Sequence, residues 1–493
     1  MKVPAVFFTR SLAKLLIGLV VLSIAAVSRL YGEERPNILL ILADDLGYGD
    51  VGFNGSEDIV TPELDRLAKE GTVFSSAYAV HPFCGPSRMA LLTGRYPHAI
   101  GVPYNLPSYS SGRHRDKGVP TAEVLLSSVL KNAGYATGLM GKWHLGHAPE
   151  FHPNQRGFDE FYGFLGGGIL YFGPYQAQNE EGTVWDYRVY PEYNGVSDKT
   201  LGKDDYMTDI LSDKGVEFIR KQSKSDAPFF LFMSYNAPHT LLAAKQDDLD
   251  RFPALEGKRK IYAAMVYALD RGVGRLVDAL EETKELENTL IVFFSDNGGR
   301  LDQGASNGEL RGAKGDVQEG GFRTPMFMHW PEGIERRQII DTPVSALDLF
   351  PSFARIANAE LAENEILDGV DILPLLRGEP SEADDRAIFA ARHRMVHTEV
   401  SGRNDRWKLI WESEEGPWRL YDLETDISEQ HDLSDVYPAQ VSALLDDIGS
   451  WLSEHIEPLW FYSEEEAEAW AREDMPKYEE MLSGDSDASE VAH

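Results

Sequence analysis

The sequence predicts an α/β fold in which a sheet of buried strands is covered by helices. Residues 37–43, 228–235 and 289–294 form nearly continuous apolar runs, the pattern of strands that are buried on both faces of a sheet. An amphipathic helix is predicted at 258–283, between two of these strands. With 493 residues, the chain is long enough for one large domain and a smaller one.

Polar residues follow two of the predicted strands at the point where each strand ends. Asp44 and Asp45 come directly after the first strand, and Asp296 and Asn297 follow the third strand after one serine. Ligands in open α/β sheets bind outside the carboxyl ends of the strands. Four carboxylate or amide oxygens, with no cysteine or histidine beside them, indicate a site for a hard cation.

The chain contains a single cysteine, Cys84. A lone cysteine cannot form a disulfide within the chain, so its thiol either packs inertly or takes part in chemistry. Pro86 suits the first position of a helix, which places Cys84 at the helix N-terminus, where the helix dipole favours an anion. Arg88 lies four residues after Cys84 on the same face, and its guanidinium is predicted to return to the atoms of Cys84.

Two further segments place a lysine and two histidines near predicted strand ends. A strand at 135–140 leads into Lys142 and His144, which would point to the same face of an extended backbone. His239 follows the strand at 228–235, and a histidine in that position favours a functional role. Helices are also predicted at 62–70, with Thr61 as N-cap, and at 121–133, 205–222 and 345–358.

The remaining segments are less regular. The region 157–193 is rich in glycine and aromatic residues, whose rings could stack on sugars or pack within a long loop. From about Arg386 the pattern changes to short strands at 387–391, 407–411 and 418–421, followed by helices at 437–455 and 464–481 and a disordered end at 483–493. This order favours a small antiparallel sheet with a helix packed on it.

The run Cys84-Gly85-Pro86-Ser87-Arg88, followed by Leu92-Thr93-Gly94-Arg95, resembles the signature of the formylglycine-dependent sulfatases. The block at 141–146 also resembles that family, and the resemblance covers residues 36–435. It implies an alkaline-phosphatase-like α/β core with a large mixed sheet between helices. Together with the change of pattern near Arg386, it divides the chain into a catalytic domain at 36–385, a C-terminal α+β subdomain with an antiparallel sheet at 386–462, and an acidic tail at 463–493.

In that family the cysteine is oxidised before folding to Cα-formylglycine (3-oxoalanine), whose hydrated aldehyde is the nucleophile. The resemblance therefore implies that Cys84 is converted by a formylglycine-generating enzyme or an anaerobic sulfatase-maturing enzyme. It also implies one Ca²⁺ ion at Asp44, Asp45, Asp296 and Asn297. Calcium fits better than magnesium because oxygens of the substrate and of formylglycine would complete six or more positions.

The same resemblance assigns the other site residues: Arg88, Lys142 and Lys314 to the sulfate oxygens, His144 to the formylglycine, and His239 to the ester oxygen. Outside the resemblance, Arg323 is a candidate for a supporting position near the site. One hydroxyl of the hydrated formylglycine would attack sulfur with Asp296 as base, while His239 or Lys314 protonates the leaving alcohol. Loss of the second hydroxyl's proton to His144 would then expel sulfate, a step that an ordinary serine could not perform.

Charge and the first residues bear on partners and location. The formal net charge of −33 argues against nucleic-acid binding through a basic surface. Residues 1–32 have three basic residues ahead of an apolar run at 15–27, followed by a small-residue cleavage pattern, which predicts a secretory signal. The chain is therefore expected to be periplasmic or secreted, with an uncleaved anchor as the alternative. After residue 32 no apolar stretch approaches the roughly 20 residues of a membrane span.

Export, the aromatic region and the acidic surface together favour a sulfated carbohydrate substrate, an algal polysaccharide or a glycosaminoglycan fragment, over a sterol or a lipid. Five residues near the motifs could recognise the sugar or belong to exposed loops: His98, Arg113, His114, Arg115 and His147. Two rival functions remain open. One is a phosphonate monoester hydrolase or phosphodiesterase of the same superfamily, and the other is a sulfated-glycan-binding protein that has lost catalysis.

Overall fold

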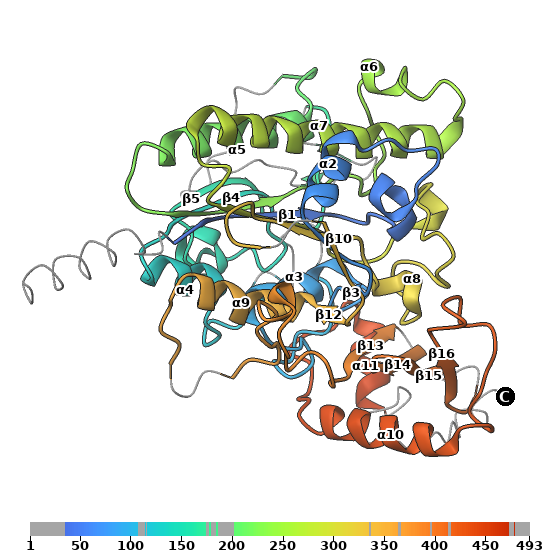
Figure 1. The fold of residues 1–493 in the computed structure, drawn as a ribbon. Helices are drawn as coiled ribbons and strands as arrows, with labels where there is room; N and C mark the ends of the chain where they lie inside the picture. The colour runs from blue at the N-terminus through green and yellow to red at the C-terminus, as the bar shows by residue number, and fades with distance from the viewer. Residues whose placement is uncertain are drawn as a thin grey trace, which may run out of the picture.

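The computed structural model describes residues 35–472 except 107–113, 115, 174–176, 179–183, 186–201, 335–336, 363–365, 395–396 and 413–415, together with residue 478. The predicted signal and most of the predicted acidic tail lie outside the described residues. In the described part, helices lie on both sides of a central sheet, and a smaller sheet lies beside this core (Figure 1).

The central sheet has eight strands in the order β11-β2-β10-β9-β1-β8-β4-β5. Their bounds are β1 Asn37–Ala43, β2 Thr72–Phe74, β4 Ala136–Lys142, β5 Glu160–Phe164, β8 Phe229–Ser234, β9 Thr289–Ser295, β10 Met326–His329 and β11 Gln338–Ile340. Strands β9, β1, β8, β4 and β5 are parallel, whereas β10 is antiparallel to both of its neighbours, so the sheet is mixed. The three predicted apolar strands and the one that leads into Lys142 are confirmed, and they are adjacent.

Helices cover both faces of this sheet (Figure 1). One face carries α2 (Pro62–Glu70), α5 (Met207–Gln222) and α7 (Gly257–Thr283), and the other carries α3 (Cys84–Thr93), α4 (Leu126–Asn132) and α9 (Leu349–Ile356). Alternate residues of β1 point to the two layers: Leu39 and Ile41 belong to one hydrophobic cluster, and Leu40 and Leu42 to the other. Each of these buried side chains contributes about 1.5–3 kcal/mol, so both layers are held to the sheet.

The smaller sheet has four antiparallel strands in chain order: β13 (Ile388–Arg394), β14 (His397–Arg403), β15 (Trp407–Glu412) and β16 (Arg419–Asp422). The helix α10 (Pro438–Leu452) packs on β14 and β15, and α11 (Glu464–Ala471) follows it. Three of the strands were predicted from their apolar residues. The fourth, β14, was missed because its sequence HTEVSGR is largely polar, although the fold buries most of it.

Several predicted bounds were wrong. Helix α3 begins at Cys84, two residues before Pro86, because the free N–H positions of a first turn tolerate proline. Helix α4 begins at Leu126 rather than after Pro120, since turns occupy the residues between them. The structure also has very short elements that carry too few residues for a periodic pattern: β3 (Ala77–Tyr78), β6 (Ala177–Gln178), β7 (Val184–Trp185), β12 (Val344–Ser345), α6 (Gln246–Leu249) and α8 (Glu319–Phe322).

A buried ionic cluster joins the smaller sheet to the core. Lys408 of β15 lies 2.9 Å from Glu319 of α8 and 2.8 Å from Glu429. Glu319 also pairs with Arg323 at 3.0 Å and accepts a hydrogen bond from Tyr78 at 2.6 Å. Burial alone would raise the pKa of Glu319, but Lys408 and Arg323 lower it to about 2. Arg323, expected near the catalytic centre, therefore belongs to this cluster.

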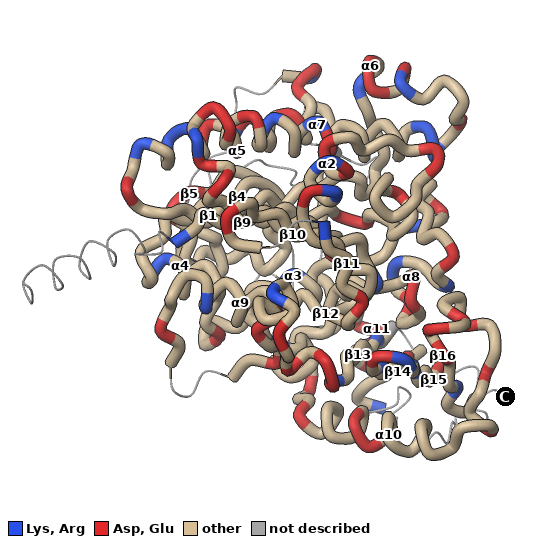
Figure 2. The backbone as a smooth tube through the Cα atoms, in the orientation of Figure 1, with Lys and Arg blue, Asp and Glu red and all other residues tan. Residues whose placement is uncertain are grey.

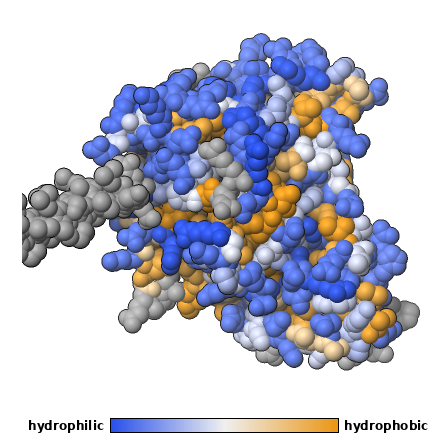
Figure 3. Space-filling model, viewed as in Figure 1, coloured by the Kyte–Doolittle hydropathy of each residue, from blue (hydrophilic) through white to orange (hydrophobic). Residues whose placement is uncertain are grey.

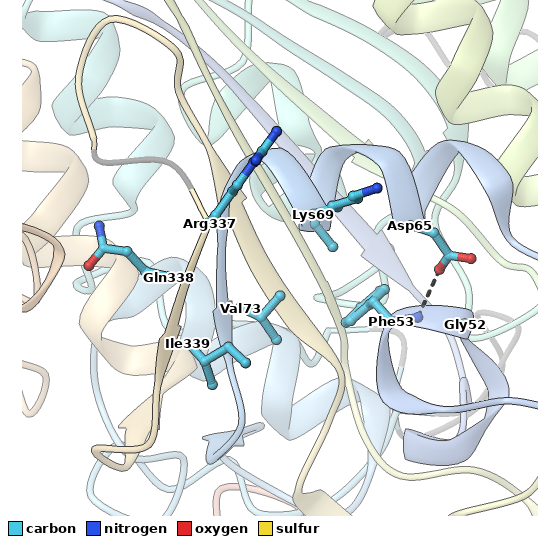
Figure 4. Close-up of a pocket in the computed structure, with 9 residues that line it drawn as sticks. Gly52, Phe53, Asp65, Lys69, Val73, Arg337, Gln338 and Ile339 are labelled. Carbon is cyan, nitrogen blue, oxygen red and sulfur yellow. Dashed lines mark hydrogen bonds between the residues drawn. The ribbon is translucent and has the colours of Figure 1, made fainter.

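Charged residues of both signs are interspersed along the outer helices, and hydrophilic residues cover much of the same face of the molecule (Figures 2 and 3). Within the described residues, none of the helices has both the length and the apolar character needed to cross a membrane. A pocket of about 390 Å³ lies at the edge of the sheet, between α2, β2 and β11 (Figure 4). None of the residues predicted to act in catalysis lines this pocket.

Candidate active site

The carboxyl ends of β9, β1, β8 and β4 bring the predicted site residues together. The register pairs Ala43 of β1 with Ser295 of β9, so Asp44 and Asp296 follow at the same level. The Asp296 amide donates to the Ala43 carbonyl at 3.1 Å, and the Asp44 amide donates to the Ala237 carbonyl at 3.1 Å. The sheet therefore fixes the backbone on which the acidic side chains stand.

Each of the three buried aspartates at this end of the sheet is paired with a lysine or an arginine. The pairs are Lys142 Nζ with Asp44 Oδ2 at 2.7 Å, Arg88 Nε with Asp296 Oδ2 at 2.7 Å, and Lys314 Nζ with Asp45 Oδ1 at 2.5 Å. Burial alone would raise the pKa of Asp45, but Lys314 and His239 hold it well below its usual value. Burial and the neighbouring Asp44 raise the pKa of Asp296.

Three side-chain oxygens in this cluster have no hydrogen-bond partner within the described part of the chain: Asp44 Oδ1, Asp45 Oδ2 and Asn297 Oδ1. Asn297 uses its amide group to donate to Asp45 Oδ1 at 2.8 Å, which leaves its own oxygen free. Buried oxygens without partners are costly unless they coordinate an ion. The donor set consists of carboxylate and amide oxygens, so it fits a hard divalent cation.

Cys84 is the first residue of α3 and is only 3% exposed. Its Sγ lies 3.9 Å from Lys314 Nζ and 3.9 Å from Asn105 Oδ1. Conversion of Cys84 to formylglycine would place oxygen atoms where the thiol now lies. Oxygen groups on residue 84 would thus lie beside Lys314 and at the positive end of a helix.

The hydrogen bonds of the Arg88 guanidinium go to groups other than Cys84. Its Nε donates to Asp296, and its Nη1 donates to Ser234 Oγ at 2.6 Å. Ser234 in turn donates to the Lys142 carbonyl at 2.6 Å. The Asp296 carboxylate and the Ser234 hydroxyl are stronger acceptors for the guanidinium than a thiol is. Through these contacts Arg88 connects the ends of β9, β8 and β4.

Lys142 and His144 do not share one face of an extended backbone, because His144 adopts a left-handed conformation with φ of 65°. The turn sends Lys142 to Asp44 and His144 to the carbonyl of Leu106, which lies 2.8 Å from His144 Nε2. A carbonyl only accepts, so Nε2 carries the hydrogen and Nδ1 carries the lone pair. Burial, reinforced by Lys142, lowers the pKa of His144 well below its usual value.

His239 stands at the more open side of the cluster, with 18% of its side chain exposed. Its Nδ1 is hydrogen-bonded to the Thr240 carbonyl, and its Nε2 lies 3.7 Å from Asp45 Oδ2. Burial lowers the pKa of His239 to about 3, although Asp45 opposes the shift. The imidazole of His239 is therefore neutral near pH 7. Lys314 behaves differently: the charge of Asp45 outweighs the effect of burial and raises the pKa of Lys314 above its usual value.

The aromatic region packs into the core where the structure describes it. Five of its rings are buried, Phe158, Phe161, Tyr162, Phe164 and Tyr171, which supports the packing interpretation for them. Tyr175 and most of the chain from there to residue 201 lie outside the described residues. Among the residues considered for sugar recognition, His114 is held by the Phe461 carbonyl at 2.8 Å and His98 is buried among other rings. Arg113 and Arg115 lie outside the described residues.

The structure thus gathers all ten predicted site residues: Asp44, Asp45, Cys84, Arg88, Lys142, His144, His239, Asp296, Asn297 and Lys314. Sequence reasoning missed two neighbours, Ser234 and Asn105. Ser234 is the last residue of β8, and its position at a strand end was an available signal. Asn105 lies in a loop with no motif around it, and nothing in the sequence pointed to it.

Residues 36–359, well over half of the chain, match the sequence profile of the family described as Sulfatase. The chain belongs to the sulfatase family. A second sulfatase profile, described as N-sulphoglucosamine sulphohydrolase, C-terminal, matches residues 314–454. Members of the sulfatase family typically act through a formylglycine and a divalent metal, and the acidic cluster of this chain is suited to such an ion.

Named sulfatases are similar to this chain over most of its length. N-acetylgalactosamine-6-sulfatase of Sus scrofa is 36% identical over 413 residues, which are 80% of this chain and 76% of that protein. Steryl-sulfatase of Homo sapiens is 32% identical over 434 residues, 73% of this chain and 72% of that protein. The crystal structure of Ps i-CgsB in complex with k-i-k-neocarrahexaose has a TM-score of 0.84 and 45% identity, covering 91% of this chain and 99% of that one.

These sulfatases confirm the predicted fold, the alkaline phosphatase superfamily and the predicted activity. The chain is a sulfuric ester hydrolase.

Proposed function

We propose that this sulfatase hydrolyses a sulfate monoester of a sulfated carbohydrate, using a formylglycine formed from Cys84. The observation that carries the proposal is the position of Cys84 at the start of α3 and beside Lys314, next to a buried cluster in which two carboxylates and one amide each have an oxygen without a partner in the described part of the chain. A sulfate monoester reacts only when the charge on its oxygens is neutralised. This site concentrates fixed positive groups where residue 84 would meet that sulfate.

Asp44, Asp45, Asp296 and Asn297 would hold the cation, for which we propose calcium. Asp44 Oδ1, Asp45 Oδ2 and Asn297 Oδ1 are the buried oxygens that lack a partner in the described part of the chain. When bound, a divalent cation polarises and neutralises the oxygens of the transferring group. Calcium suits such a site because it accepts six to eight oxygen ligands in a flexible arrangement.

The chain's own groups divide between charge neutralisation and proton transfer. Arg88, Lys142 and Lys314 contribute the positive charges. Of the two candidates for proton donor to the leaving alcohol, Lys314 is favoured because it remains an ammonium group, 3.9 Å from Cys84 Sγ. His239 is neutral, and its Nδ1–H is directed at the Thr240 carbonyl, so its Nε2 accepts rather than donates. His144, through the free lone pair of Nδ1, is the acceptor for the proton whose loss releases sulfate.

The carbohydrate assignment draws on similarity. The 45% identical relative was crystallised with a neocarrahexaose, and a 36% identical relative is an N-acetylgalactosamine-6-sulfatase. The steryl-sulfatases of Mus musculus and Homo sapiens are 34% and 32% identical over a smaller share of this chain. We therefore propose a sulfated oligosaccharide of the carrageenan type as the first substrate, with a glycosaminoglycan fragment as the second.

The test compares inorganic sulfate release from a sulfated neocarrahexaose, an oligosaccharide ending in N-acetylgalactosamine 6-sulfate, and a steryl sulfate at equal concentration. Highest kcat/KM on either carbohydrate supports the proposal, and preference for the steryl sulfate overturns it. An aryl phosphonate ester included in the same assay tests the alternative function, hydrolysis of phosphonate monoesters. Mass spectrometry of the peptide that contains residue 84 addresses the catalytically silent rival, because unmodified cysteine in an inactive protein would favour it.

We further propose that residues 1–32 direct export to the periplasm or the medium. We also propose that the chain consists of a catalytic domain at 36–385, a C-terminal subdomain at 386–462 and an acidic tail at 463–493. Cys84 is buried in the folded chain, so a formylglycine-generating or anaerobic maturing enzyme would have to act before folding is complete. Fractionation of cells that express the full chain, with N-terminal sequencing of the product, tests the export and cleavage.

A further inference from the structure

Asn105 and Leu106 lie beside residue 84, although neither belongs to the signature. The Gly85 amide donates to Asn105 Oδ1 at 2.8 Å, and the same oxygen lies 3.9 Å from Cys84 Sγ. The next residue, Leu106, accepts from His144 Nε2 at 2.8 Å. One short loop therefore contacts both the first turn of α3 and the histidine that is assigned to proton transfer.

Residue 84 has neighbours of different chemistry: an ammonium group on Lys314, and an amide oxygen on Asn105 with the imidazole of His144 close to that oxygen. Lys314, bound to Asp45, lies on the side of the carboxylate cluster. Asn105 and His144 lie close to each other near Gly85: a Cβ added to Gly85 would be 2.7 Å from Asn105 Oδ1 and 3.5 Å from His144 Cε1. The two oxygens of a hydrated aldehyde at residue 84 would thus meet unlike surroundings.

The hydrogen-bond roles on the Asn105 side are fixed by chemistry. Gly85 N–H can only donate, so the atom of Asn105 that faces it is the carbonyl oxygen. An amide oxygen has two lone pairs, and only one is used by Gly85. The second lone pair faces residue 84, where a cysteine offers only a weak S–H donor at 3.9 Å. A hydroxyl at the same place is a stronger donor.

The loop is held from outside by the segment 456–461. The Leu459 amide donates to the Gly101 carbonyl at 2.8 Å, and Trp460 Nε1 donates to the Tyr104 carbonyl at 3.2 Å. The Ile456 amide donates to the His98 carbonyl at 3.2 Å. The backbone is therefore held before Asn105 by residues 456–460 and after it by His144, which fixes the direction of the Asn105 side chain.

We infer that Asn105 is a further catalytic residue, whose Oδ1 accepts a hydrogen bond from the hydroxyl of hydrated formylglycine that does not attack sulfur. This inference rests on the proposed function. Addition of one water to the aldehyde gives the two hydroxyls, and Asn105 holds one of them on the His144 side. The other is thereby directed to the Lys314 side, where the sulfate is bound. After sulfate transfer, the held hydroxyl turns its hydrogen to His144 Nδ1, a C=O bond forms, and the C–O bond to sulfate breaks.

This role makes a prediction that does not depend on turnover. An acceptor for the hydroxyl stabilises the hydrate relative to the free aldehyde. Asn105→Leu keeps the size of the side chain but removes the acceptor, so the aldehyde fraction should rise on the order of fivefold, the weight of one neutral hydrogen bond. A hydrazide probe, which reacts with aldehyde and not with hydrate, should label the folded protein faster by the same factor. The kcat should fall on the order of 100-fold.

The matched control is Asn37→Leu. Asn37 is buried like a core residue, and its Oδ1 accepts from the Phe229 amide at 2.9 Å, but it lies at the amino end of β1, away from the site. It should lower stability while leaving kcat and hydrazide labelling unchanged. Asn105→Asp retains an acceptor and should label at nearly the wild-type rate. Asn105→Ala, which has less bulk, repeats the test should the leucine variant fail to fold.

Faster labelling and slower turnover in Asn105→Leu or Asn105→Ala, with neither change in Asn37→Leu, support the inference. Wild-type labelling in both Asn105 variants, or equal changes in Asn37→Leu, overturn it. Mass spectrometry of residue 84 accompanies each protein. Unmodified cysteine in active wild-type enzyme would remove the proposed formylglycine mechanism, whereas formylglycine with indifferent Asn105 variants would remove only the role of Asn105.

Discussion

A group of four histidines between the core and the C-terminal region should make the protein sensitive to acid. His98 stacks on His455 with ring centroids 4.9 Å apart, and its ring also lies 5.6 Å from His81 and 5.8 Å from His393. Both ring nitrogens of His98 and of His455 lack a hydrogen-bond partner within the described residues. Trp451 and Tyr478 pack against His455, so water has little access to the ring. The informative perturbation is His455→Phe, which keeps the ring and removes the titrating group.

The size of the effect follows from the pKa. Burial, then the neighbouring His393, lowers the pKa of His455 from 6.5 to about 3. The folded pKa is below the unfolded one, so stability is complete above pH 6.5 and falls as the pH decreases toward 3. At pH 5 the unfolded state has gained a proton that the folded state has not, which costs about 2 kcal/mol. Protonation of a second histidine would add charge repulsion.

The assay is urea unfolding of wild type and His455→Phe at pH 8 and at pH 5. Comparing the two proteins at each pH cancels the contribution of carboxylates that titrate in both. The variant should gain about 2 kcal/mol relative to wild type between pH 8 and pH 5. His431→Phe is the control, because that ring is 77% exposed and should show no such gain. A stability difference between wild type and His455→Phe that is the same at both pH values would refute the reasoning.

Three further predictions concern the site and its support. Cys84→Ser should fold normally but lose turnover by several orders of magnitude, since serine cannot carry two hydroxyls; sulfate release near wild type would contradict it. Asp44→Ala or Asp296→Ala should lose calcium and activity together, and elemental analysis that finds a full equivalent of metal would place the ion elsewhere. Lys408→Met should lower the free energy of unfolding by about 3–5 kcal/mol, because the buried Glu429 loses its cation and Glu319 keeps only Arg323; an unchanged urea midpoint would exclude this.

The parts of the fold that the sequence predicted are those in which burial leaves a local pattern. Residues 37–43 and 289–295 are apolar at nearly every position because both faces of the central sheet are covered. The polar residues that follow these two strands meet at one edge of the sheet because β1 and β9 are parallel neighbours, so the sequence pointed to a candidate cation site there. β14 carries no such pattern: most of its residues are polar, and its burial comes from pairing with β13 and β15 and from α10 packed on it. The two-residue strands contain too few positions for any period to show.

Within the site, residue identity was predictable and side-chain direction was not. The left-handed backbone at His144 reverses an alternation that an extended strand would have kept. Arg88 was expected at Cys84 on helical spacing alone, but Asp296 is a stronger acceptor and lies within reach only after β9 is placed beside β1. Asn105 depends entirely on tertiary structure, since its partners are the Gly85 amide and a loop held by residues 456–461.

The contacts made by residues 456–461 also bear on the order in which the molecule is built. Residue 84 is synthesised early, whereas the segment that braces the loop beside it leaves the ribosome only after most of the chain has been made. At ordinary translation speeds this interval is on the order of half a minute. Throughout that time the loop of residues 98–106 lacks the hydrogen bonds that residues 456–460 donate to it in the folded chain. Because residues 456–461 are synthesised late, Cys84 would remain accessible to a maturing enzyme until this segment packs against the loop of residues 98–106.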